Sequence, residues 1–283
     1  MGGIMKKCVL SVLVVALAAI GLAAGCAPTP PPVSSSACSG FSSSLGQCVN
    51  ARLPIGTGTF SADWYIPTAP ASALMLLQHG FSRGCGNLRG TSKSVMERGL
   101  MVVCVNADMT GGNPNLGIAL GDALADRTVV PPQGRPLPTK YIVGGHSAGG
   151  HFASAVGARL ASRGYAFLQG AVLFDPVAQD GFSANVAAIS AGGTRPVLSV
   201  AARPSVINLT NNSFGGLASL ASTFVGVQLV WSGYNLGLPY GGSCHTDVEG
   251  ENGDLVGNTA ALCTPSSTQT ARLRTLAANW ARD

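Results

Sequence analysis

Charged residues are scarce in this chain of 283 residues: they make up 10% of it, and aromatic residues only 6%. The formal net charge is +5, and loss of Lys6 and Lys7 with the N-terminal segment discussed below would leave 15 basic and 12 acidic residues, about +3. The sequence contains no run of basic residues. Because a nucleic-acid partner requires clustered positive charge, we expect none.

Patterns that bind metals are also missing. The chain has no Cys-x-x-Cys pair, and its few histidines have no ligand-like clustering: His79, His146, His151 and His245. We therefore expect no metal and no cofactor. The acidic segment Asp247-Val-Glu-Gly-Glu-Asn-Gly-Asp254 is a candidate for binding calcium. Its glycine is misplaced for an EF-hand loop, so a solvated loop is the favoured interpretation.

The most informative segment is Tyr141-Ile-Val-Gly-Gly-His-Ser-Ala-Gly-Gly150. A short β-branched run that leads into Gly-x-Ser-x-Gly is typical of a strand-to-helix turn that exposes a nucleophilic serine. Side chains at Gly145 and Gly149 would collide with the neighbouring strand and helix at so tight a turn. The pattern predicts Ser147 as the nucleophile.

The partners of Ser147 follow from the order nucleophile, acid, histidine. His245 is the one histidine that follows Ser147 and lies beyond the helix expected directly after it, so we predict it as the base. Only Asp175 and Asp180 stand between them as acids. Asp175 ends an apolar run typical of a buried strand, whereas Asp180 lies in a polar turn, so Asp175 is the predicted acid.

An oxyanion hole needs two N–H donors near the serine. The N–H of Ala148, which follows the nucleophile, is the first candidate. The apolar segment Ala73-Leu-Met-Leu-Leu-Gln-His-Gly-Phe-Ser82 makes the N–H of Phe81 the second, with Gly80 allowing a close approach. Gly80-Phe-Ser-Arg-Gly84 is itself a second Gly-x-Ser-x-Gly, but the Arg-Gly-Cys-Gly-Asn directly after Ser82 cannot continue as a helix, so we prefer Ser147.

The N-terminus has the features of an export signal. Lys6 and Lys7 precede an apolar run over residues 9–20 and the segment Leu22-Ala-Ala-Gly-Cys26, which resembles a bacterial lipobox. That resemblance implies cleavage before Cys26, its lipidation and a lipoprotein anchored to the cell envelope or cell surface. A transmembrane anchor is the alternative, but the apolar run is short for a membrane span.

Export provides an oxidising environment for the six cysteines that remain after Cys8 and Cys26. Pairing of sequence neighbours is the simplest of 15 connectivities. It would join Cys38 with Cys48, Cys85 with Cys104, and Cys244 with Cys263. The last bond would fix the loop of His245. Cys104 lies in a probable core strand, so a buried free thiol is the alternative there.

The chain is organised as a signal over residues 1–25, a Pro/Ser-rich tether over 26–37 and one domain over 38–283. Apolar runs predict strands, and longer amphipathic runs between them predict helices, an alternation typical of an α/β fold with a mostly parallel sheet. The expected strands are 60–66, 73–79, 100–106, 140–144, 170–174, 196–201 and 225–231. The expected helices are 88–98, 116–127, 150–162 and 267–281.

The stretch from Val177 to Arg195 is too short for a lid domain, so we expect an open site. An open groove would admit bulky or polymeric esters. Five residues are candidates for its apolar lining, although aromatic residues at strand ends are more often core: Phe81, Met109, Trp231, Tyr234 and Tyr240.

With these residues in place, the chain resembles the α/β-hydrolase superfamily, and within it the chlorophyllase-like and bacterial cutinase-like esterases. Three segments carry the resemblance: His79-Gly-Phe81, Gly145-His-Ser-Ala-Gly-Gly150 and Phe174-Asp-Pro-Val177. It implies Ser147, Asp175 and His245 as the triad. Cutinase-like enzymes usually carry the acid after the next strand, where Pro196-Val-Leu-Ser-Val-Ala-Ala-Arg-Pro204 has no aspartate.

The sequence therefore predicts a monomeric, membrane-tethered serine hydrolase that cleaves carboxylic esters through an acyl-enzyme. Two alternatives stay open. An acyltransferase would use the same triad and pass the acyl group to an alcohol, and a binding module would keep the scaffold without turnover.

Overall fold

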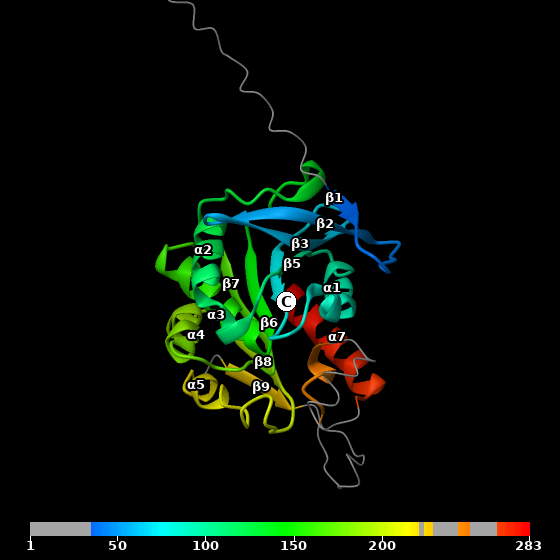
Figure 1. Ribbon diagram of the computed structural model, residues 1–283. Helices are drawn as coiled ribbons and strands as arrows, with labels where there is room; N and C mark the ends of the chain where they lie inside the picture. Colours follow the sequence, from blue (N-terminus) through cyan, green and yellow to red (C-terminus); the bar gives the residue numbers. More distant parts are fainter. Residues whose placement is uncertain (1–34, 221–223, 229–242, 250–264) are drawn as a thin grey trace, which may run out of the picture. The chain divides into compact units, whose positions relative to one another are not determined.

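The computed structural model describes residues 35–220, 224–228, 243–249 and 265–283, all within one compact unit. Their centre is a nine-stranded sheet in the order β1-β2-β3-β5-β4-β6-β7-β8-β9 (Figure 1). The strands are β1 (Ser35–Ala37), β2 (Gly46–Ile55), β3 (Gly58–Pro67), β4 (Leu74–Gln78), β5 (Met101–Asn106), β6 (Tyr141–His146), β7 (Leu168–Phe174), β8 (Val197–Ala201) and β9 (Phe224–Gln228).

The described helices are α1 (Arg89–Met96), α2 (Pro114–Ala125), α3 (Ala148–Ser162), α4 (Phe182–Ser190), α5 (Phe214–Ala218) and α7 (Ser267–Arg282). Helices α1 to α5 connect strands of the parallel part of the sheet, and α7 follows β9 in the chain. Shorter 3-10 turns include η1 (Cys85–Leu88), η4 (Ala191–Gly193) and η6 (Asp247–Glu249). Strands β4 to β9 pair in parallel, whereas β1, β2 and β3 form an antiparallel extension. The α/β class and the mostly parallel sheet are confirmed.

The core lies on both faces of the sheet. Leu74 and Leu76 of β4 face one cluster, which α2, α3 and α4 cover, while Met75 and Leu77 face another, which α1 and α7 cover (Figure 1). Successive strand residues point to opposite faces, so a strand that is apolar throughout must be buried on both. This explains why the central strands are continuous apolar runs.

Strand β2 was not among the expected strands, and its sequence contains Gly46 and Pro54, two residue types that strands disfavour. Its buried residues nevertheless alternate, with Val49, Leu53 and Ile55 on the core face. Strand β1 pairs only with residues 49–51 of β2, so Pro54, which pairs with Thr59 of β3, has no strand beside it on its other edge, where a missing N–H costs no ladder bond. Pairing also draws residues 35–37 into the sheet, although the sequence assigned them to the tether.

Two disulfides are formed as predicted, Cys38–Cys48 and Cys85–Cys104. Cys104 is therefore not a free thiol. Cys244 is also disulfide-bonded, while Cys263, its expected partner, lies outside the described residues, as do the signal and Cys26. Among the described helices, none has both the length and the apolar character of a membrane span.

Candidate active site

Ser147 stands at the turn between β6 and α3, as predicted. Its backbone has φ 56° and ψ −127°, a region that non-glycine residues avoid. The side chain is 8% exposed, and the main-chain oxygen accepts hydrogen bonds from Gly150 N at 2.9 Å and Val177 N at 3.0 Å. These bonds hold the serine in its strained conformation at the carboxyl edge of the sheet.

Glycines make this turn possible. A Cβ on Gly145 would overlap the carbonyl group of Gly149, and a Cβ on Gly149 would overlap the main-chain oxygens of Gln78 and His79. The obstacles are backbone atoms of β4 and of the helix start, which cannot rotate away as a side chain can. The collision predicted for Gly145 and Gly149 is therefore present, and these positions exclude any side chain.

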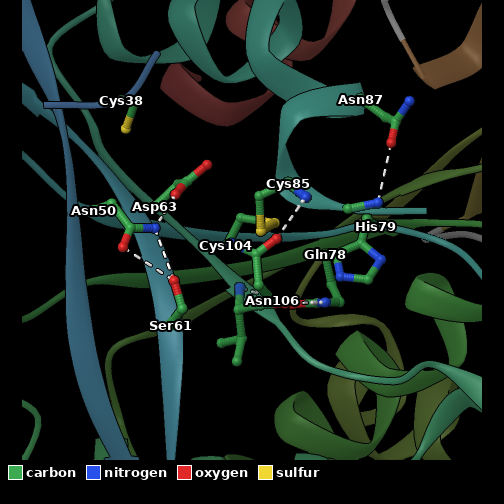
Figure 2. Close-up of a disulfide and its surroundings, with 12 residues drawn as sticks. Cys38, Asn50, Ser61, Asp63, Gln78, His79, Cys85, Asn87, Cys104 and Asn106 are labelled. Carbon is green, nitrogen blue, oxygen red and sulfur yellow. Dashed lines mark hydrogen bonds between the residues drawn. A yellow bond between two sulfur atoms is a disulfide. The ribbon is translucent and has the colours of Figure 1, made fainter.

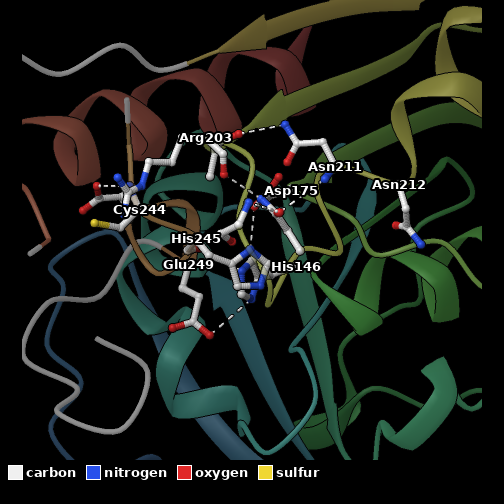
Figure 3. Close-up of polar contacts among 12 residues, drawn as sticks. His146, Asp175, Arg203, Asn211, Asn212, Cys244, His245 and Glu249 are labelled. Atoms are coloured by element: carbon white, nitrogen blue, oxygen red, sulfur yellow. Dashed lines mark hydrogen bonds and ion pairs between the residues drawn. The ribbon is translucent and has the colours of Figure 1, made fainter. Parts of the chain in front are cut away.

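Asp175 and His245 meet at the same edge of the sheet. Asp175 follows β7 directly, and its Oδ2 lies 2.5 Å from Nδ1 of His245, although the two residues are 70 positions apart (Figure 3). Both side chains are buried. His245 packs against His146, the neighbour of Ser147, with 4.4 Å between the ring centroids. The structure thus brings the predicted acid and base together beside the serine turn.

Asn208 is a residue that the sequence analysis missed. Its buried Nδ2 donates to Oδ2 of Asp175 at 3.0 Å and to the carbonyl oxygen of Arg203 at 2.8 Å. Its Oδ1 accepts from the N–H groups of Ser205 and Asn211. Every polar atom of the amide is used, so Asn208 fixes the carboxylate oxygen that contacts His245. It lies in the loop after β8, and an amide in a loop has no sequence pattern that marks it as a partner of the acid.

The loop after β4 lies against the serine turn. A Cβ on Gly80 would come within 2.8 Å of Ser147 Cβ, so only glycine allows this approach. Ala148 begins α3 and is buried. The N–H groups of Phe81 and Ala148 stay our predicted oxyanion donors. The Phe81 side chain itself is 57% exposed.

Several bonds anchor this loop to the sheet. Gln78 Nε2 donates to Val105 O at 2.7 Å, and His79 Nδ1 lies 2.9 Å from Gly80 O (Figure 2). Burial lowers the pKa of His79, consistent with a neutral ring that shapes the loop. Farther along, Cys85 N donates to Asn106 Oδ1 at 3.0 Å, next to the Cys85–Cys104 disulfide (Figure 2).

A buried ion network adjoins the base. Arg83 donates to Glu249 from two nitrogens, with Nε 2.6 Å from Oε1 and Nη2 on Oε2. Glu249 Oε1 also lies 3.2 Å from Nδ1 of His146, whose Nε2 is 3.0 Å from the main-chain oxygen of His245 (Figure 3). Burial alone would raise the pKa of Glu249, but His146 and Arg83 together lower it to about 2. Burial, and then His245, lower the pKa of His146, whereas Glu249 raises it.

This network corrects our interpretation of the acidic segment. Asp247 and Glu249 are buried, so the described part of the segment is not a solvated loop. Asp247 accepts from Cys244 N at 2.9 Å and from Ser266 N at 2.6 Å, so protein groups occupy both of its oxygens. They leave no free carboxylate face for calcium at residues 247–249.

The expected groove lining is partly corrected. Met109 is 1% exposed and belongs to the core cluster beneath α2 and α3, so it packs inside the domain instead of facing a groove. Trp231, Tyr234 and Tyr240 lie outside the described residues. Within the part of the chain that is described, Cys38, Cys48 and Asp63 bring potential metal ligands together. The two sulfurs are bonded to each other, so this group does not form a metal site.

Comparison with solved structures finds similar esterases. Carboxyl esterase 2 from the fungus Tuber melanosporum is 17% identical, with a TM-score of 0.57 over 90% of this chain and 92% of the other. A thermostable esterase from Pseudomonas putida is 14% identical, with a TM-score of 0.55 over 84% and 83% of the two chains. No protein-family model matches the sequence, and neither does any curated protein.

The chain has the α/β-hydrolase fold. In this fold the nucleophile turn, the acid and the histidine meet at the carboxyl edge of the parallel strands. Ser147, Asp175 and His245 occupy that edge here, after β6, after β7 and in the segment before η6. The β7–β8 connection holds only α4 and η4, so there is no large lid domain in it.

Proposed function

We propose that the protein is a serine hydrolase that cleaves carboxylic esters through an acyl-enzyme. One observation carries the proposal: the 2.5 Å contact between His245 and Asp175 lies beside a strained serine turn. A core packing role would not need a serine at φ 56° or a buried histidine against a buried carboxylate. The esterase folds of the similar structures support the same conclusion.

The residues divide the work as follows. Because Asp175 accepts from Nδ1 of His245, Nε2 is the nitrogen left to take the proton of Ser147. Ser147 Oγ attacks the ester carbonyl, and the N–H groups of Phe81 and Ala148 stabilise the oxyanion. His245 returns the proton to the leaving alcohol, and then activates the water that releases the acid. Asp175 stabilises the imidazolium in both half-reactions.

The short β7–β8 connection supports an open site, and so we propose hydrophobic, bulky or polymeric esters as substrates. The exposed ring of Phe81, the residue whose N–H we propose as an oxyanion donor, would contact such a substrate. An open site also favours water over a second alcohol as acyl acceptor.

The test is hydrolysis of p-nitrophenyl esters from acetate to palmitate by the purified protein and its Ser147→Ala variant. We expect serine-dependent turnover, and the acyl-length profile would separate a short-ester enzyme from a lipase or polyesterase. Labelling of Ser147 by a fluorophosphonate without turnover would favour an acyltransferase, tested with added glycerol or sugars. A folded protein that is neither labelled nor active would favour a binding module.

We also propose that the protein is exported and tethered to a bacterial membrane by a lipid on Cys26. The disulfides Cys38–Cys48 and Cys85–Cys104 support an oxidising compartment. Incorporation of radiolabelled palmitate by the full chain, and its loss in Cys26→Ser, would test the anchor. Unchanged incorporation in the variant would contradict it.

A further inference from the structure

We propose that Arg83, Glu249 and His146 are positioning residues that fix the main chain of His245 and thereby hold its ring for catalysis. This inference rests on the proposed function. The three residues come from the loop after β4, from η6 and from the end of β6. They therefore connect three parts of the proposed site: the loop of Phe81, the described segment 243–249 that carries His245 (the base segment), and the residue before Ser147.

The base segment depends on such contacts because it has little regular structure. In residues 243–249 the only element is the single turn η6. The segment is held by isolated bonds, such as that from Arg203 N to Ser243 O at 3.1 Å and that from Thr91 Oγ1 to Glu249 O at 3.1 Å. The contact of His146 Nε2 is made to the main chain of His245 itself, and so it acts directly on the position of the base.

His146 lies between Glu249 and the base. Its Nε2 faces the main-chain oxygen of His245 at 3.0 Å, which fits an N–H donor there, and its Nδ1 lies 3.2 Å from a Glu249 oxygen without a hydrogen bond of its own. Burial lowers the pKa of His146, and a neutral imidazole keeps the one N–H that the contact with His245 needs. Arg83 holds the carboxylate of Glu249 against the His146 ring from two nitrogens. The network thus fixes the ring that contacts the main chain of the base.

Stability alone does not account for this arrangement. Glu249 and His146 are almost fully buried, and desolvation makes buried ion pairs no more stabilising than apolar replacements of similar volume. Removal of one partner is costly, because it leaves a buried charge uncompensated. A network of this kind beside the base is explained if its contribution is the geometry of His245.

The experiment compares Arg83→Met, Glu249→Gln and the double variant in the full chain. Each single variant removes one charge of the buried Arg83–Glu249 pair and should lower Tm, whereas the double variant removes both charges and should recover it. The kcat of the double variant should nevertheless stay below the wild-type value, by up to about 100-fold if the His245 ring is displaced by about 1 Å. KM should be unchanged. The matched control is the half-exposed pair Arg159 and Asp122 on α3 and α2, with 2.8 Å between Nε and Oδ1. Replacing it by Met and Asn should leave kcat unchanged.

A second readout does not need turnover. The proton between His245 Nδ1 and Asp175 should give a far-downfield NMR resonance, assigned by its loss in Asp175→Asn, and the double variant should shift or broaden it. Recovery of kcat together with Tm, or an unchanged resonance, would overturn the proposal. A wild-type protein without ester hydrolysis would contradict the proposed function instead, and the resonance would still decide whether the network positions His245. If the single variants fail to fold, the kinetics and the NMR resonance are measured on the double variant alone.

Discussion

The chain contains Gly-x-Ser-x-Gly twice, and the two copies differ in their burial and surroundings. Both serines have positive φ, 54° at Ser82 and 56° at Ser147. Ser147 is buried between β6 and α3, whereas Ser82 is exposed in a turn that leads into η1. A positive φ is therefore shared by both serines, and what distinguishes Ser147 is its position: it is the single residue between the end of β6 and the start of α3, whereas Ser82 lies four residues after β4 and three before η1.

The glycines of the two copies also differ in what surrounds them. Those at Gly145 and Gly149 face backbone atoms that exclude a Cβ, while a Cβ on Gly84 would meet its nearest neighbour, Asn106 Oδ1, at an ordinary 3.5 Å. In the second copy, Gly80 lies against Ser147 and Arg83 pairs with Glu249. The copy over residues 80–84 thus packs against the turn at Ser147, which is the nucleophile in our proposal.

The largest difference should appear when each serine is replaced. Ser147→Ala should lower kcat by roughly 10⁶-fold, as loss of the nucleophile does in a serine hydrolase, without unfolding the domain. Ser82→Ala should leave kcat within a factor of about two, because a surface substitution costs little. Ester hydrolysis and thermal melting measure both. Equal losses in the two variants would contradict the assignment of the nucleophile.

Lowering the pH should weaken the contact that Arg83, in the copy over residues 80–84, makes with Glu249. The pKa of Glu249 is about 2 in the folded protein against an ordinary 4.5, so the unfolded chain binds the extra proton between these values. This contribution, about 3 kcal/mol, is fully present above pH 4.5 and is lost as the pH falls towards 2. Urea unfolding at a series of pH values should show this loss in the wild type and not in Glu249→Gln.

The control for acidification is Glu97→Gln, which removes a partly exposed ion pair with Lys93 at 2.9 Å. Such pairs contribute about 0–1 kcal/mol. Its stability should therefore follow the wild-type pH dependence closely. Parallel curves for the wild type and Glu249→Gln would contradict the role of Arg83 in the second copy.

Glycine replacements should distinguish the two turns directly. Gly149→Ala places a methyl group against the main chain of β4, and overpacking of this kind costs about 1–3 kcal/mol. Gly84→Ala, at φ −143° and with only an ordinary contact for its methyl group, should change the free energy of unfolding by less than about 0.5 kcal/mol. Chemical denaturation measures both, and equal stability of the two variants would count against the tight turn.

The smallest effect should come from weakening the support of Asp175, which lies in neither Gly-x-Ser-x-Gly copy. Asn208→Ala removes one donor to Asp175, and we expect kcat to fall about tenfold, equivalent to about 1.4 kcal/mol, with little change in KM. Asn212→Ala is the matched control, because Asn212 bonds to Ala178 in the same loop region and not to Asp175. A wild-type kcat in Asn208→Ala would contradict its role in orienting the acid.

Much of the fold could be predicted because its central strands and main helices carry local signals. The apolar runs of β4 to β8 and the helical spacing of α7 place these elements to within about three residues. Strand β2 escaped because Pro54 argues against a strand unless the unpaired edge is known. Helix α4 is only nine residues long and was not separated from the loop around it.

The candidate site divides in the same way. Chain order and strand context were enough to select Ser147, Asp175 and His245 by elimination. The roles of Asn208 and Arg83 could not be predicted by elimination. Their partners, Asp175 and Glu249, lie 33 and 166 residues away, and no sequence pattern indicates these contacts. Buried acidic residues near His245 also resembled a surface loop in sequence, since composition does not reveal what a carboxylate faces in the folded chain.

The Cys85–Cys104 disulfide has a practical consequence for anyone who produces this protein. It joins the first residue of η1, directly after the segment 80–84, to β5, and a recombinant chain made in a reducing cytoplasm would keep both thiols unpaired. Such material could fold its sheet and still present a displaced Phe81 and Arg83. Preparations for kinetics should therefore be secreted, or expressed in an oxidising host, and titrated for free thiols before any low specific activity is attributed to the wrong substrate.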